Sequence, residues 1–102
     1  MAKSSKVKLF NRKHPPKSVT LLGYTLAVRV VPYLESDNHE LLGAFNAETK
    51  TIFLLKGCDW KAVLFHELLH AAICFTASCE GMSYTAEERI VLSLESAIAP
   101  LL

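Results

Sequence analysis

The residues of this chain with the clearest chemical meaning are His66-Glu67-Leu68-Leu69-His70, an H-E-x-x-H motif. Side chains four residues apart lie on the same face of a helix, so the imidazoles of His66 and His70 can converge on one metal ion. A glutamate beside the first ligand can take a proton from a water at the open coordination position. The motif predicts hydrolysis of a peptide bond by a zinc-activated water, with Glu67 as general base.

The segment around the motif favours this interpretation. Residues 62–75 are apolar except for the two histidines and the glutamate of the motif. Each of these side chains would cost about 1–3 kcal/mol if it were buried without a partner. A metal ion satisfies all three at once. The alternative is a pair of ordinary histidines with hydrogen-bond partners and no metal.

A hydrolytic zinc site also needs a third protein ligand. Cys74 lies on the same helix, but three ligands in line along one helix do not suit tetrahedral coordination. No histidine follows His70, which excludes the pattern with a distal third histidine. The other candidates are Cys79, Glu80, Glu87, Glu88 and Glu95. We expect a carboxylate from a second helix.

Glu87 and Glu88 are both suitable carboxylates in that second helix. Glu87 shares a face with Val91, whereas Glu88 lies on the same side as Glu95. Thr85 and Glu88 also match the S/T-x-x-E capping box, which would give Glu88 a purely structural role. The residue pattern alone leaves the choice between Glu87 and Glu88 open.

The rest of the sequence predicts elements that can hold the motif. Runs rich in Val, Leu and Thr predict strands within 18–33, 41–45 and 51–55. The first run, interrupted by Gly23, predicts two short strands or one bent strand. The other two predict a hairpin around the loop 46–50. The polar residues 35–40 predict a turn.

The period of the sequence changes at Asp59, a suitable N-cap for a helix that reaches about Thr76. A second helix is expected from about Ala86 to Ala99, with its apolar stripe on the core. The predicted fold is α+β: a small three-stranded curved sheet with a hairpin, packed on the motif helix, and a second C-terminal helix. The apolar stripe of the second helix comprises Ile90, Val91, Leu94, Ile98 and Leu101.

The segment His66-Glu67-Leu68-Leu69-His70-Ala71, followed by Glu88-Arg89-Ile90-Val91 at the head of an apolar helix, resembles the minimal gluzincin-type zinc peptidases. Many of these are phage and prophage proteins, similar in plan to SprT-like and ImmA-like peptidase domains. The resemblance covers about residues 18–102. It implies that Glu88 is the third zinc ligand, beside His66 and His70.

The resemblance also implies how a peptide or protein substrate binds. An extended peptide would add to the sheet edge nearest the metal, within 42–46 or 51–55, where Gly43 permits close approach of the backbone. Tyr84 is the expected oxyanion-stabilising catalytic residue, with His39 and Arg89 as alternatives.

The charges divide the chain into two parts. Residues 1–34 contain seven Lys and Arg and no acid, which gives +7, whereas residues 35–102 contain four bases and ten acids, which gives −6. We expect 1–17 to be a basic flexible arm and 18–102 a minimal metallopeptidase-like domain. The arm suggests an alternative function: an inactive zinc-stabilised binding module that contacts nucleic acid or a partner protein.

The composition sets the outer limits of these predictions. A chain of 102 residues, 51% hydrophobic and 21% charged, allows one globular domain and excludes a disordered polypeptide. No segment reaches the length of a membrane span, and the N-terminus lacks the apolar core of a signal peptide. Three cysteines, an odd number, argue against a disulfide framework. We expect a cytoplasmic protein without a membrane partner.

Overall fold

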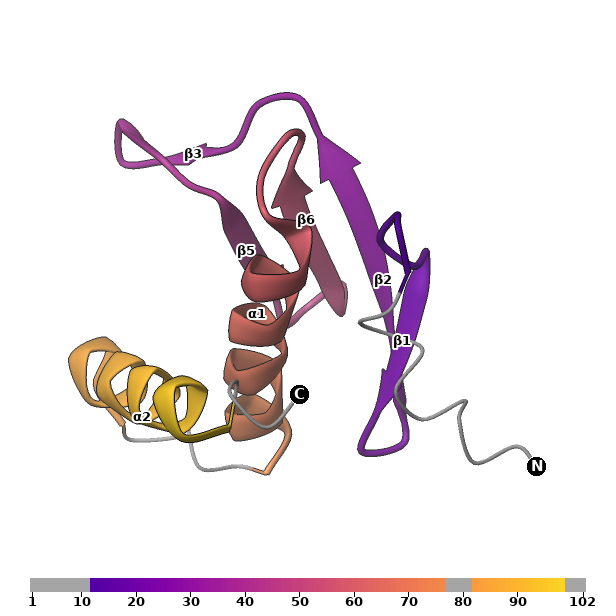
Figure 1. Cartoon of the computed structure of the whole chain (residues 1–102). Helices are drawn as coiled ribbons and strands as arrows, with labels where there is room; N and C mark the ends of the chain where they lie inside the picture. The colour runs from indigo at the N-terminus through magenta and orange to yellow at the C-terminus, as the bar shows by residue number, and fades with distance from the viewer. Residues whose placement is uncertain (1–11, 77–81, 99–102) are drawn as a thin grey trace.

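The structure is a computed structural model that describes residues 12–76 and 82–98. It shows an α+β domain, as predicted, in which a curved sheet packs on α1 and α2 lies across the far side of that helix (Figure 1). The elements in chain order are β1 (Ser18–Leu21), β2 (Tyr24–Val31), β3 (Glu35–Ser36), β4 (His39–Glu40), β5 (Gly43–Asn46), β6 (Thr51–Leu55), α1 (Trp60–Phe75) and α2 (Tyr84–Ile98).

The main sheet has four strands in the order β1-β2-β6-β5, not the three predicted. The difference arises at Leu22 and Gly23, whose positive φ angles of 51° and 83° allow a two-residue hairpin turn. The run 18–33 therefore folds into two paired strands. β2 and β6 run parallel at the centre, and the other pairs are antiparallel. β1 and β5 are the two edges.

The polar segment 35–40 forms a two-stranded ribbon, β3 and β4, instead of a simple turn. Asp37 and Asn38 both adopt positive φ, which allows the chain to reverse within two residues. The hairpin predicted from the two apolar runs is confirmed, since β5 and β6 pair with Asn46 opposite Thr51. This hairpin brings β5 to the edge of the sheet beside α1.

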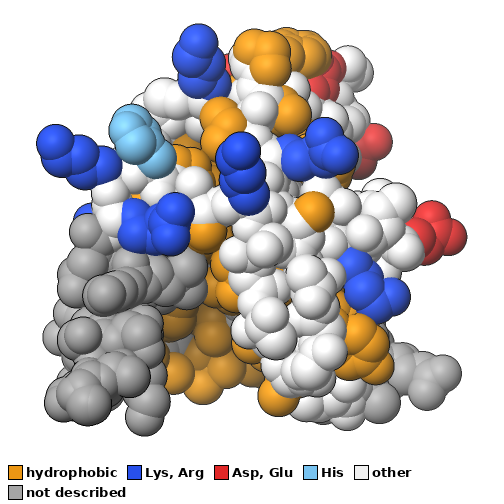
Figure 2. Space-filling view, turned by 90° about the vertical axis from the view of Figure 1, so that its right-hand side faces the viewer, with side chains coloured by type: hydrophobic (Ala, Val, Ile, Leu, Met, Phe, Trp, Pro, Cys, Tyr) orange, Lys and Arg blue, Asp and Glu red, His pale blue; other side chains and the backbone are white. Residues whose placement is uncertain are grey.

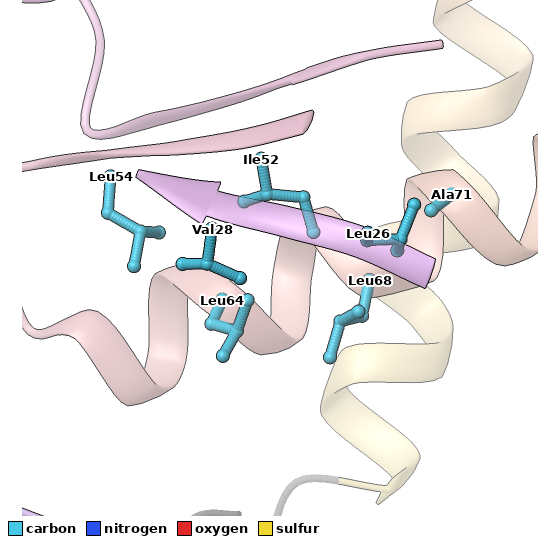
Figure 3. Packing of buried hydrophobic residues seen from close by; sticks show 7 residues of the cluster. All are labelled: Leu26, Val28, Ile52, Leu54, Leu64, Leu68 and Ala71. Carbon is cyan, nitrogen blue, oxygen red and sulfur yellow. The ribbon is translucent and has the colours of Figure 1, made fainter. Parts of the chain in front are cut away.

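The core lies between the two central strands and one face of α1 (Figure 3). Leu64, Leu68 and Ala71 of α1 recur at helical spacing and face the sheet. This contact fixes the rotation of α1 about its axis and directs His66 and His70 away from the sheet. The buried strand residues of the cluster are Leu26, Val28, Ile52 and Leu54.

The second helix begins at Tyr84, two residues earlier than predicted. Ser83 caps it, because its hydroxyl accepts a hydrogen bond from the backbone N–H of Ala86 at 3.1 Å. The capping box proposed for Thr85 and Glu88 is therefore wrong, since Thr85 lies inside the helix. Glu88 is not used as a cap.

The prediction that the apolar stripe of α2 faces the core is confirmed only in part. Val91 is fully buried, whereas Ile90 and Leu94 are 39% and 37% exposed. The reason is that α2 packs mainly on α1, and this one helix covers only a narrow strip of the surface of α2. Leu101, the last residue of the stripe, lies outside the described residues.

Most of the predicted basic arm, residues 1–11, lies outside the described part of the chain. Its remaining residues contact the domain: Lys13 O accepts from Trp60 Nε1 at 3.2 Å, and Lys17 O accepts from Val28 N at 2.9 Å. Lys and Arg side chains gather on the face that carries β1 and β2, with few acidic side chains among them (Figure 2). Neither α1 nor α2 has the length and apolar character needed to span a membrane.

Candidate metal centre

The two histidines of the motif meet a carboxylate of the second helix. The rings of His66 and His70 lie 5.0 Å apart between centroids. Glu88 Oε1 is 2.9 Å from His70 Nε2, and Glu88 Oε2 is 3.7 Å from His66 Nε2. One carboxylate therefore reaches the same ring nitrogen of both histidines.

These three side chains form a group that fits a zinc ion. One ligand atom from each of His66, His70 and Glu88 can be chosen so that all lie within 4.8 Å of one another. Tetrahedral zinc with bonds of about 2.0–2.2 Å needs its ligand atoms roughly 3.4 Å apart, so binding would draw the three side chains together. Two imidazoles and one carboxylate leave a fourth position open, as in hydrolytic zinc sites.

Two further carboxylates of α2 contact the other ring nitrogens. Glu87 Oε2 lies 2.5 Å from His70 Nδ1, and Glu95 Oε1 lies 3.1 Å from His66 Nδ1. In this geometry Glu87 does not approach the nitrogens that face Glu88. The sequence reasoning considered Glu87 and Glu95 only as metal ligands and missed these contacts. The sequence held one indication of these contacts: Glu87 and Glu95 are eight residues apart, about two helical turns, which puts them on the same side of α2.

Glu67 lies on a different side of α1, against β5. Its side chain is only 8% exposed, which is unusual for a glutamate. Burial raises the pKa of Glu67 above its usual range, and the nearby Glu88 and Glu95 raise it further; His70 and His66 act in the opposite direction. A carboxyl of perturbed pKa that lines the same cleft as the candidate metal ligands is a candidate for proton transfer.

The close contact between β5 and α1 depends on Gly43. A Cβ atom at this position would lie 2.4 Å from Val63 Cγ1 and 3.3 Å from Glu67 Oε2. The close approach seen at Gly43 is to α1, where its neighbour is the glutamate of the motif, and the approach of a substrate backbone stays a prediction. Glycine lets the edge strand lie directly over Glu67.

We expect Gly43→Ala to destabilise the protein by about 1–3 kcal/mol, because the added methyl group overlaps Val63 and forces β5 away from α1. Chemical unfolding with urea measures the change. The matched test is the same substitution in a Val63→Ala background, where Cγ1 is absent. An equal loss in both backgrounds would contradict this explanation.

A cleft of about 620 Å³ opens over this group. Its lining includes the three candidate ligands, Glu67, residues 41–45 and Tyr84. Tyr84 is 74% exposed at the rim, and the negative charge of Glu88 is the main reason that its pKa is raised. His39 and Arg89, the alternatives to Tyr84, are both exposed and do not line the cleft in the described part of the chain.

Comparisons of the chain with protein-family models, with curated proteins and with solved structures find no match. The resemblance to gluzincin-type peptidases therefore rests on the motif residues and their order along the chain.

Proposed function

We propose that this protein is a zinc-dependent metallopeptidase of the minimal gluzincin type. The observation that carries the proposal is the convergence of His66 Nε2, His70 Nε2 and Glu88 at an open cleft beside the buried carboxyl of Glu67. A purely structural zinc site closes its fourth position with protein and has no use for such a glutamate.

His66, His70 and Glu88 would hold the zinc ion. When bound, zinc polarises the peptide carbonyl and lowers the pKa of water towards about 7. Glu67 accepts the proton of the attacking water and transfers it to the leaving amine. Its position supports this role, because the buried carboxyl lines the same cleft as the three candidate ligands.

The edge strand β5 is the proposed site for the backbone of the substrate. Among the described residues its one neighbour in the sheet is β6, so its other side can pair with an added strand. β6 lies between β2 and β5 and has no free edge. Of the two segments expected to pair with a substrate, 42–46 and 51–55, the second is therefore ruled out. A peptide paired with β5 near Gly43 lies next to Glu67.

Tyr84 is the proposed oxyanion-stabilising residue. It lines the same cleft as the three candidate ligands, from the first turn of α2. Its hydroxyl can donate a hydrogen bond to the negative oxygen that develops on the scissile carbonyl.

The proposal is tested by the metal content of the purified protein. We expect about one zinc per chain after purification without chelator, measured by elemental analysis, together with hydrolysis of a peptide library that a chelator abolishes and added zinc restores. A wild-type protein without stoichiometric zinc would overturn the proposal. Stoichiometric zinc without hydrolysis of any library peptide would favour the inactive binding module instead.

A further inference from the structure

We infer that Glu87 and Glu95 are positioning residues that hold the two zinc-binding histidines in the correct orientation. The inference rests on the proposed function, because it assigns these residues a role in the same site. Glu87 would fix the ring of His70, and Glu95 would fix the ring of His66.

The contacts divide the ring nitrogens into two sets. Both Nδ1 atoms face an outer carboxylate, at 2.5 Å for His70 and 3.1 Å for His66. Both Nε2 atoms face Glu88. A carboxylate that accepts a hydrogen bond from Nδ1–H fixes the tautomer, leaves the Nε2 lone pair for the metal and makes the imidazole a stronger ligand.

The backbone explains how one helix supplies three different carboxylates. The earlier residue of α2, Glu87, contacts the later histidine of α1, and the later residue, Glu95, contacts the earlier one. The two helices therefore cross with opposed directions. Glu88 and Glu95 are seven residues apart, about two turns, so they lie on one face of α2. Docking of α2 delivers the ligand and both positioning residues together.

The surroundings of Glu87 and Glu95 support this role over a general structural one. Their side chains are 20% and 26% exposed. Among residues 12–76 and 82–98, Glu95 and Glu87 contact His66 and His70, and neither forms an ion pair with a lysine or arginine. In the part of the chain that the structure describes, the contacts of these two partly buried carboxylates with basic side chains are those with His66 and His70, which suits a role in positioning the two rings.

The test measures zinc affinity in the full-length protein by competition with a chromophoric chelator. We expect Glu87→Ala and Glu95→Ala each to lower the affinity about 10–100-fold, while saturating zinc still gives one ion per chain. The glutamine variants should lose less, because the amide oxygen still accepts a hydrogen bond. Glu35→Ala, an exposed glutamate of β3, is the control and should bind as wild type.

Histidine NMR of the zinc-loaded protein supplies a readout that a merely structural role would not change. The Nδ1–H signal of His70 should be altered in Glu87→Ala, and that of His66 in Glu95→Ala. Wild-type affinity in both alanine variants would overturn the inference alone. Complete loss of zinc from Glu87→Ala with retention in Glu88→Ala would also overturn it, because Glu87 would then be the ligand. Absence of zinc from the wild type would instead reject the proposed function itself.

Discussion

Glu67→Gln is expected to lower kcat/KM for peptide hydrolysis by about 10²–10⁴-fold while the zinc content stays at the wild-type value. Glutamine has nearly the same shape, but its amide cannot accept the proton of the attacking water. The metal should remain, because Glu67 is not part of the group formed by His66, His70 and Glu88. Peptide hydrolysis and elemental analysis of the same sample measure both quantities.

Tyr84→Phe is the comparison variant for this experiment. It removes a single hydroxyl at the rim of the cleft, and loss of one oxyanion donor costs about 10²–10³ in kcat. Zinc content should again be unchanged. If Glu67→Gln retained full activity, the role of Glu67 as general base would be rejected. If it lost zinc as well, Glu67 would belong to the metal site.

Glu67→Gln also has a consequence for the stability of the zinc-free protein. Because burial raises the pKa of Glu67, the folded state prefers the protonated carboxyl. The stabilising contribution of Glu67 is fully present below pH 4.5, the pKa of the carboxyl in the unfolded chain. It is lost as the pH rises through the higher pKa of the folded state. Glu67→Gln should therefore raise the unfolding midpoint at neutral pH and leave it nearly unchanged well below pH 4.5. Thermal unfolding of chelated samples at both pH values measures the difference.

The parts of the fold that follow from local pattern could be predicted from the sequence. The extent of α1 and the β5–β6 hairpin were predicted within a few residues, because a change of period or a short loop between apolar runs marks each of them. The sequence left open whether the run 18–33 forms two strands or one, because Gly23 marks a break but the positive φ of Leu22, rare for leucine, follows from no local pattern. The turn at Leu22 and Gly23 gives the sheet its fourth strand.

The candidate site, like the fold, could be predicted from local spacing only in part. The spacing of His66 and His70 specifies a shared helix face, and the structure brings them to one carboxylate as expected. The partners of their Nδ1 atoms depend on how α2 crosses α1, which no local pattern encodes. From the residue pattern alone, the choice between Glu87 and Glu88 as the ligand stays open until that crossing is known.

Removal of zinc is expected to lower the stability of the fold by several kcal/mol. A ligand that binds only the folded state stabilises it by about 4 kcal/mol when its free concentration is 1,000-fold above Kd. For a domain of this size, that corresponds to a fall of roughly 15–30 °C in the thermal midpoint. The effect should be concentrated in α2, which has Val91 as its one buried side chain and packs mainly on α1.

Two measurements locate this effect. Thermal unfolding of zinc-loaded and chelated samples gives its size, and amide hydrogen exchange shows where it acts: exchange should accelerate most in α2 and least in β2 and β6, whose core contacts do not involve the metal. His66→Ala serves as the control, because its midpoint should not respond to zinc. Equal midpoints for loaded and chelated wild type would mean that contacts such as those of His70 with Glu87 and Glu88 hold α2 without a metal.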